Sequence, residues 1–164
     1  MEIKDYLIAQ VKSAHGLLDS AIKDTPAEMV NRKVGEHANT IAAVYAHVIG
    51  GEDYFIQGAA QGKARLWESN DWAQKLGITA PLGRDWSIQI PDLDAFRAYA
   101  QTVHEATYAY LDTMTPAELD RVVKVFNNER AVSRVMTLIV THTCGHAGEI
   151  ATLKGAMGVK GLPF

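Results

Sequence analysis

Hydrophobic side chains recur at helical spacing in four long stretches of the chain. The stretches are Ile3–Ile22 and, with approximate ends, Asn39–Gln61, Asp92–Met114 and Ser133–Met157. Spacings of three and four residues place the apolar side chains of each stretch on one face of an amphipathic helix. Four helices of about 20 residues, each about 30 Å long, predict an all-α fold with the architecture of a four-helix bundle.

The connection between the second and third helices is long, at roughly residues 62–91. A crossover of this length is expected to contain structure of its own, and Leu66–Leu76 is the candidate for a short helix that ends at Gly77. This segment holds all the tryptophans of the chain, Trp67, Trp72 and Trp86. Two compatible roles are open for them: large aromatic side chains that plug one end of the bundle, or the wall of a substrate-binding pocket.

Several polar residues are placed where helices are expected to begin. Asp92 and Ser133 are candidate N-caps for the third and fourth helices. The tetrapeptide Thr-Pro-Ala-Glu occurs at Thr25–Glu28 and again at Thr115–Glu118. With threonine as the N-cap and proline at the first helical position, it predicts a short helical turn in both places. The repeated tetrapeptide reflects either an internal repeat of a helix pair or chance. The alternating stretch Arg121–Phe126 favours an extended segment, such as a short hairpin.

Composition narrows the class of protein. The 164 residues suit a single domain spanning 1–164, and a hydrophobic content of 48% with 21% charged residues is typical of a folded globular chain. A net charge of −3 argues against nucleic-acid binding. No apolar run approaches the length of a membrane span, and the mixed, charged N-terminus does not resemble a signal peptide. One cysteine excludes an intramolecular disulfide, so we expect a cytoplasmic protein.

Two histidines in the fourth helix have the spacing of metal ligands. His142 and His146 stand four residues apart and lie one above the other on a helix, so both imidazoles can reach one ion. They also continue the apolar face formed by Val135, Ile139 and Ile150. An unsatisfied buried polar group costs about 1–3 kcal/mol, so two inward imidazoles need partners. A metal ion satisfies that need; hydrogen bonds within the core are the alternative.

A third histidine is expected at the same level. His47 lies about eight residues into the second helix and His142 about nine residues into the fourth. In an up-down-up-down bundle these two helices run parallel, which would bring the rings together. Three imidazoles leave at least one coordination position open, as in reactive metal sites. His15, His37 and His104 have no histidine at matching spacing or depth, so we expect surface or packing roles for them. We therefore expect one metal site per chain.

Three carboxylates near these histidines have ambiguous roles. Glu149 follows His146 by one helical turn, where it could orient the ring as a hydrogen-bond acceptor or pair with Lys154 in solvent. Glu52 and Asp53 follow His47 and carry the same ambiguity.

These residues resemble those of the DinB/YfiT-like superfamily. The resemblance is carried by His47 with Glu52-Asp53-Tyr54-Phe55 behind it, by the stretch from His142 to Ile150, and by the closing Leu153–Gly158. The crossover segment Trp67–Gly77 is similar to one branch of the superfamily, so the resemblance covers nearly the whole chain.

The resemblance implies a four-helix bundle with an unusual helix order and a divalent metal held by three histidines. The ligands would be His47 from the second helix and His142 and His146 from the fourth. Nickel and zinc are the implied metals, and iron is a further candidate because histidine ligands suit all three. Members are commonly homodimers, and some are transferases or isomerases that use a low-molecular-weight thiol.

Three functions are therefore in competition. The first is a metal-dependent enzyme, a thiol S-transferase or a hydrolase, whose thiol or water attacks a small electrophile held against Trp67, Trp72 and Trp86. The second is a non-enzymatic protein that binds a metal or small ligand in a stress response. The third is a structural dimerisation module whose histidines only form hydrogen bonds.

Overall fold

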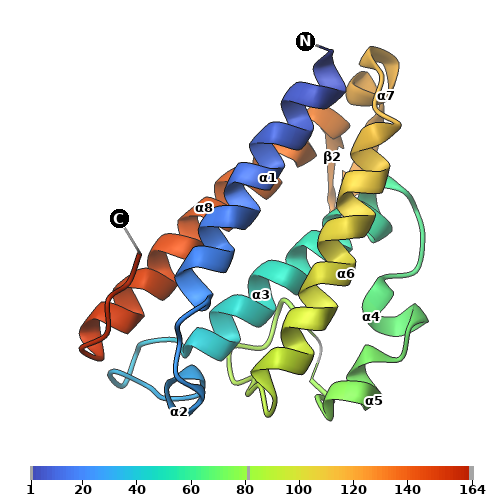
Figure 1. The fold of residues 1–164 in the computed structure, drawn as a ribbon. Coiled ribbons are helices and arrows are strands. Elements are labelled where there is room, and N and C mark those ends of the chain that lie inside the picture. Colours follow the sequence, from blue (N-terminus) through green and yellow to red (C-terminus); the bar gives the residue numbers. More distant parts are fainter. Residues whose placement is uncertain (1, 81, 163–164) are drawn as a thin grey trace.

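A computed structural model describes residues 2–80 and 82–162 of the chain, and within them the predicted four-helix bundle is confirmed (Figure 1). Its long helices are α1 (Ile3–Ile22), α3 (Ile41–Asp53), α6 (Leu93–Asp112) and α8 (Val132–Ala156). A π-helical segment, η1 (Tyr54–Ala60), continues α3, so the predicted second helix changes its winding halfway along. The described helices include none that is long and apolar enough to cross a membrane.

Short elements fill the connections between the long helices. They are α2 (Ala27–Val30), α4 (Leu66–Ser69), α5 (Trp72–Leu76), α7 (Pro116–Asp120), and the strands β1 (Val122–Val125) and β2 (Asn128–Ala131). The crossover thus holds two short helices where one was expected. Asp71 separates them with a left-handed backbone at φ 54°, and Gly77, also left-handed, ends α5 as predicted.

The helices do not follow the expected up-down-up-down order. Tyr45 packs on Phe96 near the start of α3 and α6, and Glu52 meets Thr107 near their ends, so these two helices run parallel. In Figure 1, α1 and α8 run in the opposite direction to α3 and α6. The expectation that the second and fourth long helices are parallel is therefore wrong. The physical reason is the long crossover, which carries the chain back along the bundle before α6 begins.

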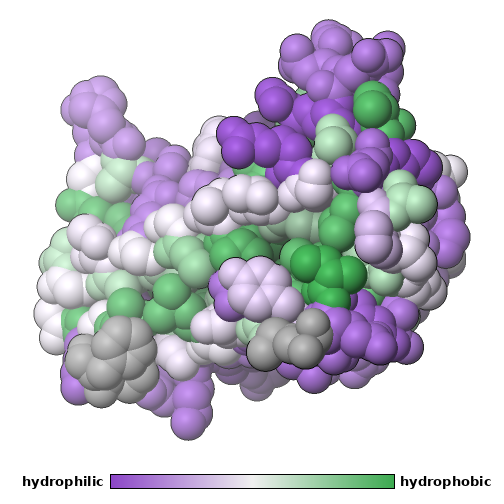
Figure 2. Space-filling model, turned by 90° about the horizontal axis from the view of Figure 1, so that it is seen from above, coloured by the Kyte–Doolittle hydropathy of each residue, from purple (hydrophilic) through white to green (hydrophobic). Residues whose placement is uncertain are grey.

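The apolar faces of the helices meet as the periodicity predicted. Two clusters of buried side chains form the core: one joins α1, α3, α6, α8 and the crossover, and the other joins α1, η1, the hairpin and the first half of α8. Figure 2 shows the surface from above, where hydrophobic residues lie in the middle and on the left of the view and hydrophilic residues lie mostly at the top, right and bottom. Burial of these apolar faces is the main stabilising contribution to the bundle.

The helix starts were predicted with mixed success. Asp92 accepts hydrogen bonds from two backbone amides at the start of α6, and Thr115 accepts one at the start of α7, which confirms both caps. Ser133 is not the cap of α8, because β2 leads directly into the helix and Val132 is already helical. Thr25 does not cap α2; its hydroxyl is buried and has no hydrogen-bond partner among the described residues.

The alternating stretch after α7 forms the expected hairpin. The strands pair antiparallel from Val122 with Ala131 to Val125 with Asn128. Phe126, at the turn, has a left-handed backbone with φ 53°, and its ring stacks on Tyr54 of η1 with centroids 5.0 Å apart. The Phe126 amide also donates to the Tyr54 hydroxyl at 2.8 Å. These contacts fix the hairpin tip against the helix that carries His47.

Candidate metal centre

The three predicted histidines come together between α3 and α8. The Nε2 atoms of His47 and His142 lie 2.9 Å apart, and the ring of His146 is centred 4.5 Å from that of His142. One ligand nitrogen from each ring lies within 4.8 Å of the others. Although α3 and α8 run antiparallel, the rings meet because the two helices pack side by side, with Gly51 also facing His142. The three histidines therefore lie together as predicted, although the prediction assumed the wrong helix direction.

The surroundings of His47 single it out on its helix. Every residue of α3 is buried except His47 and Gly51, which are half-buried and face α8. A Cβ atom added at Gly51 would lie 3.4 Å from Cε1 of His142, so this glycine leaves room for the opposing ring. At Gly50 an added Cβ would lie 2.6 Å from Cβ of Leu82, so this glycine admits the crossover. Close approach to neighbouring elements accounts for the glycine pair inside the helix.

In His47 and His146, a hydrogen bond at Nδ1 selects the tautomer of the ring. Nδ1 of His47 donates to the backbone carbonyl of Gly83 at 2.8 Å, and Nδ1 of His146 donates to Glu149 at 2.7 Å. The other oxygen of Glu149 accepts from Asn39 at 3.1 Å. With Nδ1 protonated, Nε2 of each neutral ring carries the lone pair that binds a metal ion.

Glu149 thus takes the first of its two predicted roles, as an acceptor that orients a histidine. It does not pair with Lys154, whose amine is buried and donates to the backbone carbonyl of Ala21 at 2.9 Å. This bond places the positive charge of α8 against the C-terminal end of α1, where the helix dipole favours a cation.

Burial favours the uncharged form of two of the rings, those of His47 and His142. Burial lowers the pKa of His47, and burial together with the neighbouring imidazoles lowers the pKa of His142 to about 4. A neutral imidazole is the form that coordinates a metal ion, so the rings need lose no proton to bind one near neutral pH.

A pocket of about 420 Å³ opens over His47 and His142. Aromatic rings and two arginines line it in addition to the backbone of the crossover: Tyr54, Phe55, Phe126, Arg65 and Arg84. The guanidinium of Arg84 lies over the Phe126 ring, 5.7 Å from its centre. The pocket therefore combines apolar walls with positive charge beside the histidines.

The tryptophans divide between this site and the core. The ring of Trp86 is centred 4.5 Å from that of His47 and is 40% exposed, so Trp86 borders the histidines. Trp67 and Trp72 instead pack on Tyr99 of α6, with ring centres 5.2 and 5.5 Å away. Trp67 and Trp72 thus have the packing role, whereas Trp86 lies beside the histidines, and its part in substrate binding stays a prediction.

Glu52 and Asp53 point away from the three histidines. Asp53 accepts from the backbone amides of Leu66 and Trp67, both at 2.9 Å, and from the Tyr99 hydroxyl at 2.8 Å. It therefore anchors α4 to α3 and α6. Glu52 bonds to buried groups of α1 and α6 instead of the metal centre.

The contact between His15 and His104 was not predicted. Their rings stack with centres 3.6 Å apart, and both face Glu52, so the expectation that they stand alone is wrong. A signal was present: His15 lies on the apolar stripe of the first helix, and His104 adjoins Val103 on that of the third. Buried histidines on two facing helices require polar partners.

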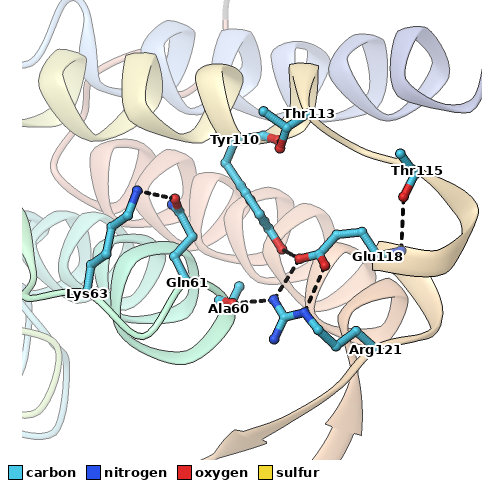
Figure 3. Close-up of polar contacts among 8 residues, drawn as sticks. All are labelled: Ala60, Gln61, Lys63, Tyr110, Thr113, Thr115, Glu118 and Arg121. Atoms are coloured by element: carbon cyan, nitrogen blue, oxygen red, sulfur yellow. Dashed lines mark hydrogen bonds and ion pairs between the residues drawn. The ribbon is translucent and has the colours of Figure 1, made fainter.

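A wider pocket, of about 710 Å³, lies at the corner of α6 and α7. Figure 3 shows that its polar groups bond to one another: Tyr110 donates to Glu118 at 2.5 Å, and Arg121 donates to both Glu118 and the carbonyl of Ala60. The Arg121 side chain holds down the pKa of Glu118, to about 2. This network joins η1 to α7 and leaves no converging set of ligand atoms.

The chain is similar to a known protein family. A family model described as the DinB superfamily matches residues 7–150 of this chain. A comparison of the chain with curated proteins found no match.

Solved structures share the fold across nearly the whole chain. A conserved protein from Enterococcus faecalis has a TM-score of 0.82 at 15% identity and covers 96% of this chain and 99% of its own. The DinB-like protein YjoA from Bacillus subtilis has a TM-score of 0.68 at 17% identity, covering 97% and 96%. YfiT from Bacillus subtilis, described as a probable metal-dependent hydrolase with an unusual four-helix bundle topology, also has a TM-score of 0.68 at 17% identity, covering 96% and 89%.

Proposed function

The chain belongs to the DinB superfamily, and we propose that it is a metal-dependent enzyme that transfers a small thiol to an electrophile. The observation that carries the proposal is the convergence of three imidazoles, two of which have Nδ1 already hydrogen-bonded and two of which line an open pocket. A site for a purely structural ion would be closed by a fourth protein ligand.

The donor set fits a divalent ion of the first transition series. His47, His142 and His146 would hold it through nitrogen, and imidazole suits nickel, zinc and iron. When bound, such an ion supplies Lewis acidity, which makes a thiol or water a better nucleophile at neutral pH.

The residues of the pocket would hold the reactants. Phe55 and Phe126 line the pocket, and Trp86 packs beside His47; together they would offer apolar surface to the body of the electrophile and exclude water from it. Arg84 extends over the Phe126 ring at the rim, where its charge would attract the carboxylate of a small thiol or a leaving anion. The carbonyl of Gly83 and the carboxylate of Glu149 keep two histidine rings in place while the reactants exchange.

Hydrolysis is the second candidate, with water in place of the thiol. It is favoured by the shared fold with YfiT, whose description as a probable metal-dependent hydrolase concerns that protein. The same open pocket admits either nucleophile. A non-enzymatic binding role would use the same residues without turnover.

The test compares metal-free protein with protein loaded with nickel or zinc. Each form is incubated with a panel of small thiols and either monobromobimane or a chlorinated aromatic compound, and product is measured by chromatography. We expect thioether formation that depends on the metal and is lost in His146→Ala. His37→Ala is the matched control, because His37 is exposed and remote from the three-histidine set.

Turnover of ester or amide substrates without thiol would favour the hydrolase. Metal binding without turnover of either substrate class would favour the non-enzymatic role. Equal rates in the metal-free and loaded forms would contradict both enzymatic proposals.

A further inference from the structure

A second group of metal-type donors lies buried between α1, α3 and α6. His15, Glu52 and His104 come from these helices in that order, and their side chains are 2%, 2% and 3% exposed. One donor atom from each lies within 4.8 Å of the others. Glu52 follows His47 by five residues, which is about 140° around α3 at 100° per residue, so the two groups lie on different sides of that helix.

The donor atoms are spaced for one small ion. Oε2 of Glu52 lies 2.9 Å from Nε2 of His15 and 3.9 Å from Nε2 of His104. Ligand atoms about 2.0–2.1 Å from a tetrahedral zinc ion are about 3.3–3.4 Å from one another, between these two values. The imidazoles now stack at 11° to each other, and a small splay of the rings would equalise the separations.

The outer partners of a metal site are already present. The Tyr108 hydroxyl lies 2.7 Å from Nδ1 of His15 and can accept a hydrogen bond from it. In that tautomer Nε2, which lies 2.9 Å from Glu52, would carry the lone pair that binds an ion. Thr107 donates to Oε1 of Glu52 at 2.5 Å, which leaves Oε2 facing the histidines. The same arrangement of outer acceptors fixes the rings at the three-histidine centre.

One atom of this group lacks a partner. Nε2 of His104 is buried and has no hydrogen bond to any of the described residues. An unsatisfied buried polar atom is uncommon in a native core, and an ion at the focus of the cluster would satisfy it.

We propose that His15, Glu52 and His104 form a second, interior site for a divalent transition-metal ion. Two imidazoles and one carboxylate suit zinc, nickel and cobalt, whereas magnesium and calcium prefer oxygen ligands. An ion can enter through a surface pocket of about 380 Å³ that His104 lines together with Asp19 and Tyr45. The site would tie three of the four long helices together, and it does not depend on the enzymatic function proposed above.

The test is a count of bound ions. Metal-free protein is loaded with excess Co²⁺, passed through a desalting column and analysed by elemental mass spectrometry. We expect two ions per chain in the wild type, one in His146→Ala, one in Glu52→Gln and none in the combined variant. Glu52→Gln keeps the size of the side chain, and circular dichroism shows whether each variant is folded.

A second variant tests the site independently, in case Glu52→Gln does not fold. His104→Phe keeps an aromatic ring against His15 but removes the unpartnered nitrogen, and it should also bind one ion. Gln101→Ala is the matched control, because Gln101 lines the same pocket and offers no donor to the cluster, so it should bind two.

One ion in the wild type, retained in Glu52→Gln and lost in His146→Ala, would overturn the interior site and leave the three-histidine centre intact. One ion retained in His146→Ala and lost in Glu52→Gln would instead support the interior site and contradict the metal centre on which the proposed function rests.

Discussion

The bond from His146 to Glu149 decides which nitrogen of that ring is left for a metal ion. Removing such an outer partner typically reduces metal affinity by about 10–100-fold. We therefore expect Glu149→Ala to weaken nickel or zinc binding at the three-histidine centre by about this factor, measured by competition with a chromophoric chelator. Glu105→Ala is the control, since Glu105 is exposed and bonds only to Gln101 in the described contacts. Unchanged affinity in Glu149→Ala would show that the bond does not orient the ligand.

His146 itself is expected to be dispensable for folding. The His146→Ala variant should lose the ion held by the three-histidine centre, because two imidazoles make an incomplete site. Its far-UV circular dichroism should match the wild type, because the half-buried ring is not part of the apolar core. His37→Ala should keep both the ion and the fold. Global unfolding of His146→Ala would mean that the histidine cluster is structural.

The tryptophans are expected to differ in what their removal changes. Trp86→Ala should weaken binding of the electrophile to metal-loaded protein by about 1–3 kcal/mol, measured by calorimetry, because it removes an aromatic contact beside His47. Trp67→Ala should instead lower the free energy of unfolding by about 3–5 kcal/mol, because it opens a cavity against Tyr99. If the two variants bind the ligand equally well, Trp86 does not form part of the pocket.

At Gly50, the crossover approaches α3 so closely that no side chain larger than hydrogen fits between them. Gly50→Ala would bring a Cβ atom to 2.6 Å from Leu82 and displace the loop whose Gly83 carbonyl orients His47. We expect a loss of stability of about 1–3 kcal/mol in thermal denaturation together with weaker metal binding.

Gly145→Ala provides the matched comparison on α8. Nothing lies within 4 Å of the added methyl group, and alanine favours the helix over glycine, so this variant should gain about 0.5–1 kcal/mol. A neutral Gly50→Ala with unchanged metal affinity would show that the crossover does not position His47.

At the level of elements, sequence patterns predicted what local chemistry controls. The limits of α1, the caps Asp92 and Thr115 and the hairpin after α7 follow from periodicity and from side chains that bond within one turn. The prediction of Ser133 failed because β2 runs straight into α8, so that the N-cap is Ala131, two residues earlier. The change of winding at η1 has no comparable signal, because the apolar spacing continues through it.

Across the whole molecule, the arrangement of helices depends on contacts that no single helix encodes. The crossover has room to run back along the bundle, and Asp53 fastens its first turn to α3 through the amides of Leu66 and Trp67. Periodicity shows which face of a helix is buried but not which neighbour buries it. For that reason the pair His142 and His146 was predicted from its spacing on one helix, and His47 only from an assumed equal depth in another. The cluster across α1, α3 and α6 was not predicted.

A bound ion should raise the stability of the whole bundle without being required for it. At a free metal concentration of 100 times Kd, binding to the native state alone adds about 2.7 kcal/mol. For a chain of this size that corresponds to an increase in Tm of about 5–11 °C. Differential scanning calorimetry with nickel should show this increment for the three-histidine centre as the difference between wild type and His146→Ala. Protein treated with a chelator should keep its helical circular dichroism and unfold at a lower temperature, since the helices pack through apolar faces. Loss of helical structure on chelation at 25 °C would contradict this and make the metal part of the fold.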